Sequence, residues 1–232
     1  MFEVNIQKKI PQLDMNIAFT LKKGVLAILG TSGCGKTMTL KCIAGITNPD
    51  SGYISNNGIY LYNSEKKISL NPHKRKVGYV FQNYALFPHM TVHQNISYGL
   101  GLFNSSKNHS AVSDIINRVR LNGLEKRYPH QLSGGQQQRC ALARTLVTDP
   151  EILLLDEPFS AADGHTKHIL ESELIEIIKS NFHKPVLLVT HNIEEAYRLS
   201  DRIMIIEHGK TVQTASKKEI IDHPKTLNAA RI

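Results

Sequence analysis

The sequence has few cysteines and no long apolar run. These two features argue against a disulfide-rich, zinc-binding or membrane-spanning protein. Its three cysteines, Cys34, Cys42 and Cys140, are widely spaced, without a Cys-x-x-Cys pair or a matching histidine cluster. A disulfide framework or a zinc site is therefore not indicated, and reduced thiols are expected. The longest apolar runs, such as Val25–Leu29, are far shorter than the ~20 residues that cross a bilayer. We do not expect the chain to span a membrane by itself.

Signals for export and for nucleic-acid binding are also weak. The first residues, Met1 to Asn5, lack a basic segment followed by a long apolar stretch, so no secretory signal is predicted and a cytosolic location is expected. The net charge of +8 would suit nucleic acid or an anionic membrane surface. No run of like charges stands out, however, and a solvated basic surface explains the charge equally well. With 41% hydrophobic and 21% charged residues, the composition is that of an ordinary globular protein rather than a disordered or fibrous one.

Short apolar segments of strand type alternate with longer segments of helical period, which is typical of an α/β domain with a mainly parallel sheet. The expected strands are 25–29, 77–81, 152–155, 186–189 and 203–206, and a helix is expected over 36–44. Segments 52–54 and 59–62 flank Asn56, Asn57 and Gly58. Asparagine and glycine tolerate positive φ, so this stretch predicts a hairpin and a small N-terminal antiparallel sheet.

Between these strands the pattern becomes helical. Residues 90–145 lose the strand period and gain helical spacing, for instance at Ile115, Ile116 and Val119. A later helix is expected to carry Leu170, Leu174, Ile177 and Ile178 on one face. The pattern predicts one domain over 1–232, in which a helical subdomain of about residues 83–147 is inserted into the α/β core.

A glycine-rich segment follows the first buried strand and fits the phosphate-binding loop pattern. It consists of Gly30, Thr31, Ser32, Gly33, Cys34, Gly35, Lys36 and Thr37. Glycine lets the backbone curl so that several N–H groups point at one phosphate, aided by the N-terminus of the next helix. Lys36 is expected to reach the β and γ phosphates of a nucleotide and Thr37 to bind Mg²⁺. The alternative, a plain glycine turn, does not explain the strand before the loop and the helix after it.

Two carboxylates end the strand expected at 152–155. Ligands of parallel sheets bind at the carboxyl ends of the strands, which is where Asp156 and Glu157 stand. Asp156 is expected to hold Mg²⁺ through water, and Glu157 to take a proton from the attacking water. A helix cap or a solvated pair is the alternative, which the upstream phosphate loop disfavours.

A second anion site is expected where residues 132–136 open a helix that ends before Asp149 and Pro150. A serine and two glycines at a helix start offer free N–H groups and the positive end of the helix dipole. This segment consists of Leu132, Ser133, Gly134, Gly135 and Gln136. A helix cap with a flexible lead is the alternative if the segment is considered alone.

These motifs, in this order, resemble those of the ABC ATPases, and 132–136 matches their signature motif without a change. The resemblance covers nearly the whole chain and implies a P-loop NTPase that binds ATP and Mg²⁺ and hydrolyses ATP. It also implies that residues 133–136 of one subunit face the γ-phosphate held by the other subunit, and hence a homodimer. The nucleotide would bind residues 30–37 of one subunit and this signature segment of its partner.

The resemblance implies further site residues. Gln82 resembles the Q-loop glutamine that senses the γ-phosphate and the metal, and His191 resembles the switch histidine, although Asn192 and Glu195 also suggest a helix entry there. Residues 160–163 resemble the D-loop and retain Asp163, but Ala162 replaces the usual leucine. The aromatic residue on which the family commonly stacks adenine is missing before the loop, and Phe2 is the nearest substitute.

Residues 82–92 resemble importer ATPases for oxyanions, polyamines and ferric iron. The resemblance implies two membrane permease subunits, an extracytoplasmic solute-binding protein acting indirectly, no nucleic acid, and a place on the cytoplasmic face of the membrane. Tyr84, Leu86, Phe87 and Pro88 are candidates for permease docking or for the buried core. The position of the loop near the N-terminus most resembles molybdate importers, and a C-terminal regulatory barrel is not expected within 232 residues.

Two other classes of function remain alternatives. DNA-repair ABC ATPases insert long heptad arms between the loop and the signature, and ribosomal ones carry tandem cassettes, neither of which is present in this sequence. A nucleotide-binding regulator without turnover would not need Glu157. Cys34 lies beside Lys36 before a helix N-terminus, which favours a reactive thiolate, whereas a small filler residue shielded by loop packing is the alternative.

Overall fold

The computed structural model describes residues 1–100, 106–160 and 164–225. Its internal contacts divide the chain into two compact units, each assembled from separate stretches of sequence. Unit 1 consists of Met1–Val77, Glu151–Glu157 and Lys184–Ile232, and unit 2 of Gly78–Pro150 and Pro158–His183.

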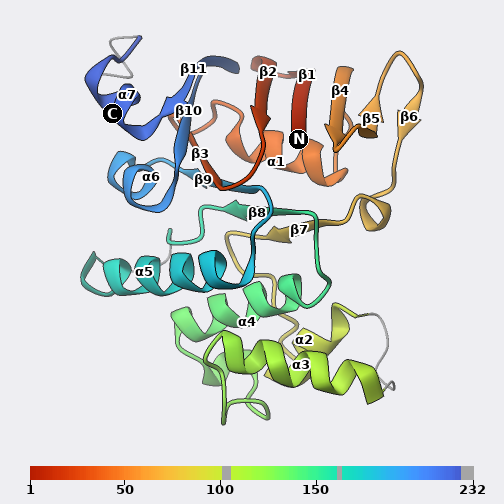
Figure 1. The fold of residues 1–232 in the computed structure, drawn as a ribbon, viewed down its shortest axis with the longest axis vertical. Coiled ribbons are helices and arrows are strands. Elements are labelled where there is room, and N and C mark those ends of the chain that lie inside the picture. The colour runs from red at the N-terminus through yellow and green to blue at the C-terminus, as the bar shows by residue number, and fades with distance from the viewer. Residues whose placement is uncertain (101–105, 161–163, 226–232) are drawn as a thin grey trace. The chain divides into compact units, whose positions relative to one another are not determined.

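Unit 1 is built on a mixed sheet whose strands run in the order β6-β5-β4-β1-β2-β11-β10-β3-β9-β8 (Figure 1). The N-terminal strands are β1 (Phe2–Ile10), β2 (Leu13–Leu21), β4 (Ser51–Asn56), β5 (Ile59–Asn63) and β6 (Ile68–Ser69). The remaining strands are β3 (Val25–Leu29), β8 (Ile152–Asp156), β9 (Val186–Thr190), β10 (Arg202–Glu207) and β11 (Lys210–Ser216). The pairs β10–β3, β3–β9 and β9–β8 are parallel, whereas β1 pairs antiparallel with both β2 and β4.

The sequence explains both parts of this sheet. Strands β3, β8 and β9 are buried at every position, as expected for parallel strands that are covered on both faces. Strand β1 instead alternates, with Phe2, Val4 and Ile6 buried between more exposed residues, so only one of its faces is in the core. The predicted hairpin is confirmed, since β4 and β5 are joined by Asn57 and Gly58 at φ of 51° and 80°.

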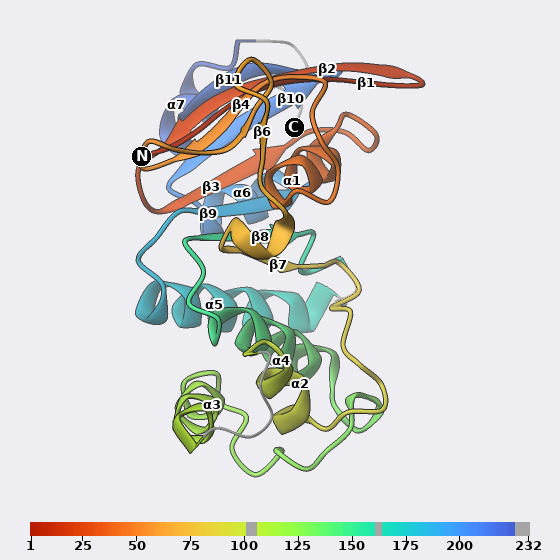
Figure 2. The ribbon, with the colours of Figure 1, turned by 90° about the vertical axis from the view of Figure 1, so that its right-hand side faces the viewer.

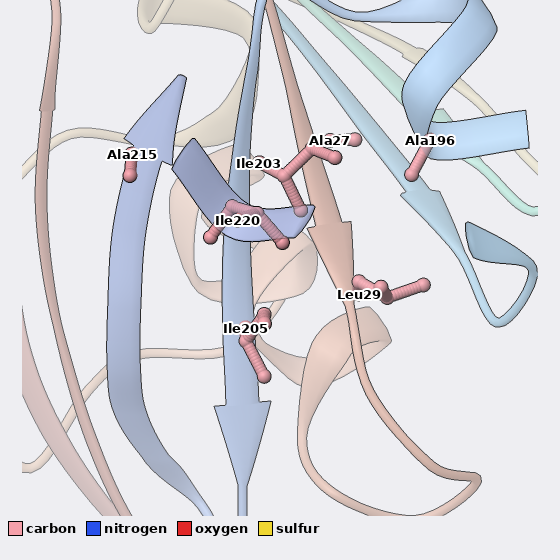
Figure 3. Packing of buried hydrophobic residues seen from close by; sticks show 7 residues of the cluster. All are labelled: Ala27, Leu29, Ala196, Ile203, Ile205, Ala215 and Ile220. Carbon is pink, nitrogen blue, oxygen red and sulfur yellow. The ribbon is translucent and has the colours of Figure 1, made fainter. Parts of the chain in front are cut away.

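The helices of unit 1 are α1 (Lys36–Ala44), α6 (Ile193–Leu199) and α7 (Lys217–Asp222), with a 3₁₀ turn η1 at Pro72–Lys74. Figure 3 shows one part of the core, where side chains from β3, β10 and β11 meet α6 and α7. Ile203 and Ile205 lie beside Ala27 and Leu29, and Ala196 and Ile220 contribute from the two helices. This packing fixes the strand β3 that leads into the phosphate loop.

Unit 2 is mainly helical within its described residues. It contains β7 (Val77–Val80), whose first residue closes the first stretch of unit 1, α2 (Val92–Tyr98), α3 (Ser106–Arg118), η2 (Pro129–Gln131), α4 (Gly134–Leu146) and α5 (Gly164–Asn181). Helices α2, α3 and α4 lie side by side (Figure 2). Leu174, Ile177 and Ile178 of α5 are buried, as the helical period predicts, whereas Leu170 is half-buried. Among the described residues, no helix is long and apolar enough to cross a membrane.

Candidate functional site

The predicted phosphate loop lies between the end of β3 and the start of α1, both in unit 1. Gly35 is the N-cap of α1 at φ 108°, a left-handed conformation that favours glycine. Gly30 has a different reason to be glycine, because a Cβ there would collide with the carbonyl oxygen of Ile206 in β10. The loop is thus tightly curled and pressed against the neighbouring strand.

The first two residues of α1, Lys36 and Thr37, contribute an ammonium group and a hydroxyl group to the site. Lys36 is 5% exposed, and its Nζ donates hydrogen bonds to the carbonyl oxygens of Gly30 at 2.7 Å and Thr31 at 3.0 Å. Thr37 Oγ1 donates to Asp156 Oδ1 at 2.9 Å, which joins the helix start to the end of β8. Lys36, Thr37 and Asp156 are therefore together in space although 119 positions separate the last two.

Glu157 follows Asp156 and faces the same region. It lines a cavity of about 300 Å³ together with Lys36, Thr37, Lys41 and residues of the loop. Its backbone has φ of 43°, which is unusual for a residue other than glycine and marks a conformation that the surroundings impose. Two lysines and one carboxylate around one cavity can hold an anionic group beside a proton acceptor.

The donor set also fits the metal expected from the sequence. A hydroxyl on Thr37 and a carboxylate on Asp156 are hard oxygen ligands, and Mg²⁺ is usually bound through one or two such protein groups plus phosphate oxygens and water. Within the described residues there is no cluster of three or more histidine, cysteine or acidic side chains that could hold a metal. The Thr37–Asp156 pair by itself supplies two oxygen ligands, which suits a metal that arrives with a phosphate ligand.

His191 lies next to Glu157 at the end of β9. Its Nδ1 is 3.5 Å from Glu157 Oε2, and its side chain is 56% exposed. The helix α6 that follows is capped by Asn192, whose side chain accepts a hydrogen bond from the backbone N–H of Glu195 at 3.0 Å. Because Asn192 provides the cap, the imidazole of His191 is not required for helix entry and is placed against Glu157.

The second predicted anion site is the start of α4 in unit 2. Ser133 is the N-cap, and its Oγ accepts from the N–H of Gln136 at 3.3 Å, while Gln136 Oε1 accepts from the N–H of Ser133 at 2.9 Å. The side chain of Gln136 is thus turned back onto the cap. Gly135 is packed under Leu170 of α5, so closely that an added Cβ would collide with that side chain. Gly134 has no atom within 4 Å of such a Cβ among the described residues.

Two other predicted site residues, Gln82 and Asp163, belong neither to the residues around the phosphate loop nor to the start of α4. Gln82 lies after β7 in unit 2, where its Nε2 donates to Ser160 Oγ at 3.1 Å. Its role at the γ-phosphate stays a prediction. Asp163 and Ala162 lie outside the described residues.

The comparison with protein families identifies the chain. The model of the ABC transporter family matches residues 15–160, which include the phosphate loop, the signature segment, Asp156 and Glu157. The chain belongs to the ABC transporter family.

Curated relatives of this ABC transporter chain include import proteins. A sulfate/thiosulfate import ATP-binding protein, CysA of Synechococcus elongatus, is 43% identical over 218 residues, which cover 93% of the chain and 61% of the relative. A molybdenum import ATP-binding protein, ModC of Pasteurella multocida, is 39% identical over 228 residues, covering 98% of the chain and 64% of the relative. The chain thus spans less than two thirds of the length of these relatives.

Solved structures confirm the fold of this ABC transporter chain. CbiO1 of Clostridium perfringens, part of the CbiONQ ABC transporter complex, superposes with a TM-score of 0.81 at 26% identity, covering 94% of the chain and 89% of that protein. The ATP-binding cassette MJ0796, a dimer in a post-hydrolysis state bound to ADP and phosphate, gives 0.74 at 26% identity, covering 94% and 99%. The predicted class, an α/β P-loop ATPase fold, is confirmed.

The expectation that Cys34 favours a thiolate is wrong. The Cys34 side chain is buried, and burial raises the pKa of its thiol more than the charge of Lys36 lowers it. Burial also raises the pKa of Cys42 to about 11 and that of Cys140 to about 12. In this ABC transporter chain Cys34 acts as a packing residue that fills the inside of the loop.

The suggestion that Phe2 replaces the missing stacking aromatic is also wrong. Phe2 is fully buried in the sheet and packs edge to face on Phe19, with ring centroids 6.1 Å apart. The residues beside the phosphate loop are instead those of the β1–β2 turn, since Ile10 lines the cavity that contains Lys36. Sequence reasoning missed this turn, although the alternation of β1 and β2 on either side of Pro11 and Gln12 indicated a hairpin.

Proposed function

We propose that this chain is the ATP-binding and ATP-hydrolysing subunit of an ABC importer. The observation that carries the proposal is the convergence of Lys36, Thr37 and Glu157 on one cavity beside the phosphate loop, with Asp156 hydrogen-bonded to Thr37. A lysine, a hydroxyl-carboxylate pair and a separate carboxylate are the groups that phosphoryl transfer to water needs. The names of the relatives, import ATP-binding proteins, support the same function.

Each residue has a distinct proposed role in hydrolysis. Lys36 binds the β and γ phosphates, and the backbone N–H groups of the loop surround them. Thr37 and Asp156 hold Mg²⁺, which when bound neutralises part of the charge that develops on the phosphates. Glu157 accepts the proton of the attacking water, and His191, 3.5 Å from Glu157, positions that carboxylate.

The signature segment supports a homodimeric arrangement. Neither a positive φ nor a close neighbour in the described part of the chain requires a glycine at position 134, whereas a phosphate approaching the start of α4 from outside would. The N-terminus of α4 supplies partial positive charge for such a group. The similar cassette MJ0796 is a dimer. We infer that Ser133 and Gly134 bind the nucleotide held by the phosphate loop of the second copy.

Permease subunits would dock on the segment after Gln82. Tyr84 is buried, which favours the core interpretation for that residue. Phe87 instead lies against Tyr98 with ring centroids 4.5 Å apart, and Tyr98 is 48% exposed. Arg144 donates to the carbonyl oxygens of Tyr84 at 2.9 Å and Ala85 at 2.7 Å, which fixes this loop. We infer a docking role for Phe87 and Tyr98 and a peripheral place on the cytoplasmic face of the membrane.

The proposed solute is a tetrahedral oxyanion such as molybdate or sulfate. Relatives at 43% and 39% identity are named for sulfate/thiosulfate and molybdenum import. An importer for polyamine or ferric iron has no comparable support from these names, and neither has a non-transport ABC ATPase. The solute-binding protein acts outside the membrane and would not touch this chain.

The experiment that tests this function uses the chain together with its co-purified membrane subunits and solute-binding protein in lipid vesicles. We expect ATP hydrolysis to rise when the vesicles contain either sulfate or molybdate with the binding protein, and to be lost in Lys36→Ala. Stimulation by spermidine or ferric iron alone would contradict the oxyanion assignment. Absence of a co-purifying membrane protein, with turnover intact, would contradict the importer function.

A further inference from the structure

A second, larger cavity of about 640 Å³ lies beside the phosphate loop. Three separate stretches of unit 1 line it, namely the β1–β2 turn at residues 10–13, the loop at residues 31–34, and His208. It shares Ile10, Ser32 and Gly33 with the cavity that contains Lys36, so the two spaces adjoin. A ligand whose phosphates bind at Lys36 can extend past the loop into the second cavity.

His208 is held in place by the turn between β10 and β11. His208 and Gly209 have φ of 47° and 78°, the conformation of a two-residue type I′ hairpin turn. The backbone N–H of Asn16 donates to the carbonyl oxygen of Gly209 at 2.7 Å, and a Cβ on Gly209 would come within 2.6 Å of the carbonyl oxygen of Asp14. This turn is therefore fastened to the β1–β2 hairpin.

The same turn is fixed relative to the phosphate loop. Strand β10 pairs with β3 through Leu29, and Gly30 packs directly on the backbone of Ile206, two residues before His208. The sheet thus determines where the backbone of His208 stands with respect to the loop, although about 170 positions separate them in the sequence, and the exposed side chain lines the cavity from there.

The chemistry of the lining suits a flat, partly apolar group. Ile10, Pro11 and Leu13 contribute aliphatic surface, and Gln12 offers both a hydrogen-bond donor and an acceptor. Among the described residues that line this cavity, none is phenylalanine, tyrosine or tryptophan, and His208 is the one with a planar ring. A ring of this kind can stack on a nucleobase, as aromatic residues do.

We propose that the purine base of the nucleotide occupies this cavity and that the imidazole of His208 is its stacking contact, with Ile10 beside it. The proposal rests on the proposed function, since it requires the phosphates at Lys36. It assigns base recognition to the β10–β11 turn, far from the phosphate loop in the sequence. Replacing this ring should weaken the binding of a nucleotide but not that of its phosphate chain alone.

The test compares ATP with inorganic tripolyphosphate by calorimetry on the purified chain. His208→Asn keeps a residue that tolerates positive φ but removes the ring. We expect it to weaken ATP binding about 5- to 150-fold, the range of a lost base–aromatic stack, and to leave tripolyphosphate binding unchanged. His208→Phe retains a planar ring and should bind ATP more tightly than His208→Asn, although positive φ suits phenylalanine less well than asparagine. His73→Asn replaces an exposed histidine in η1 that does not line the cavity, and should change neither affinity.

Unchanged ATP affinity in His208→Asn would overturn the proposal, and so would an equal loss for ATP and tripolyphosphate, which would indicate a distorted loop. A second measurement needs no variant. Photoaffinity labelling of the unmodified chain with 8-azido-ATP should modify a peptide that contains His208 or residues 10–13. Labelling elsewhere would overturn the proposal. Failure of the underlying nucleotide site is distinguishable, because Lys36→Ala would then bind both ligands as well as the unmodified chain.

Discussion

At the scale of single residues, the backbone conformation of Glu157 supports its proposed role as the proton acceptor. A non-glycine residue at φ 43° is held in a conformation that costs of order 1 kcal/mol, and such residues gather at functional sites. The N–H of Glu157 donates to the carbonyl oxygen of Val189 at 3.1 Å, which ties this bend to β9. The strained turn places the carboxylate over the cavity instead of continuing the strand.

We therefore expect Glu157→Gln to bind ATP normally but to hydrolyse it about 10²- to 10⁴-fold more slowly, because the amide cannot accept a proton from water. Single-turnover phosphate release and equilibrium ATP binding would be measured on the same preparation. Glu194→Gln on the exposed face of α6 is a matched control and should behave like the unmodified chain. Normal phosphate release by Glu157→Gln would remove this residue from the mechanism and favour a different proton acceptor.

At the scale of elements, helix α1 depends on an unusual support at its C-terminus. Arg75 is buried, and its Nη1 donates to the carbonyl oxygens of Cys42 at 2.8 Å and Ile43 at 3.0 Å. Its Nε donates to the carbonyl oxygen of Leu70 at 2.8 Å. A buried cation at a helix C-terminus donates additional hydrogen bonds to the carbonyl groups of the last turn and complements the helix dipole.

Replacing this support should destabilise the chain. We expect Arg75→Met, which keeps the length of the side chain, to lower the free energy of unfolding by about 2–4 kcal/mol, because buried carbonyl groups lose their donors. The free energy of unfolding would be measured by urea titration, with circular dichroism as the readout. Arg202→Met is the matched control, since its guanidinium makes an exposed bond to the carbonyl oxygen of Thr20, and it should lose less than about 1 kcal/mol. An equally small loss in Arg75→Met would show that water replaces the guanidinium.

Elements that are determined by a pattern of adjacent residues were predictable from the sequence. The apolar runs at β3, β8 and β9 and the Asn57–Gly58 turn gave strands and a hairpin close to their observed bounds. The phosphate loop and the helix after it were predictable for the same reason, since glycine placement and helix entry are properties of adjacent residues.

Features that depend on distant pairings were not predictable. The burial that raises the pKa of Cys34 comes from the packing of the whole loop, whereas the sequence displayed only its neighbour Lys36. The cavity beside His208 is lined by residues that lie far apart in the sequence, and the hydrogen bond between Asn16 and Gly209 that ties the two turns together has no local sequence pattern. Such long-range contacts follow from the complete sheet order and not from any short motif.

At the scale of the whole molecule, the two segments that are predicted to bind phosphate belong to separate units. Lys36 belongs to unit 1, and the start of α4 with Ser133 belongs to unit 2. If each nucleotide is bound by Lys36 of one copy and Ser133 of another, the working enzyme is a symmetric dimer with two composite sites. Damage to either residue then disables both sites of a homodimer.

This arrangement is testable by mixing two inactive chains. Lys36→Ala and Ser133→Arg should each lack ATPase activity alone, because every site contains the damaged residue. A mixed dimer has one site that combines Lys36 of one chain with Ser133 of the other, so mixing should restore activity.

Random pairing makes about half of the dimers mixed, and each mixed dimer has one intact site of its two. Recovery is therefore limited to about a quarter of the unmodified rate. Mixing Lys36→Ala with Thr37→Ala is the control and should restore nothing, since every site then has a damaged loop. Turnover by either variant alone at the unmodified rate would show that the sites are not shared.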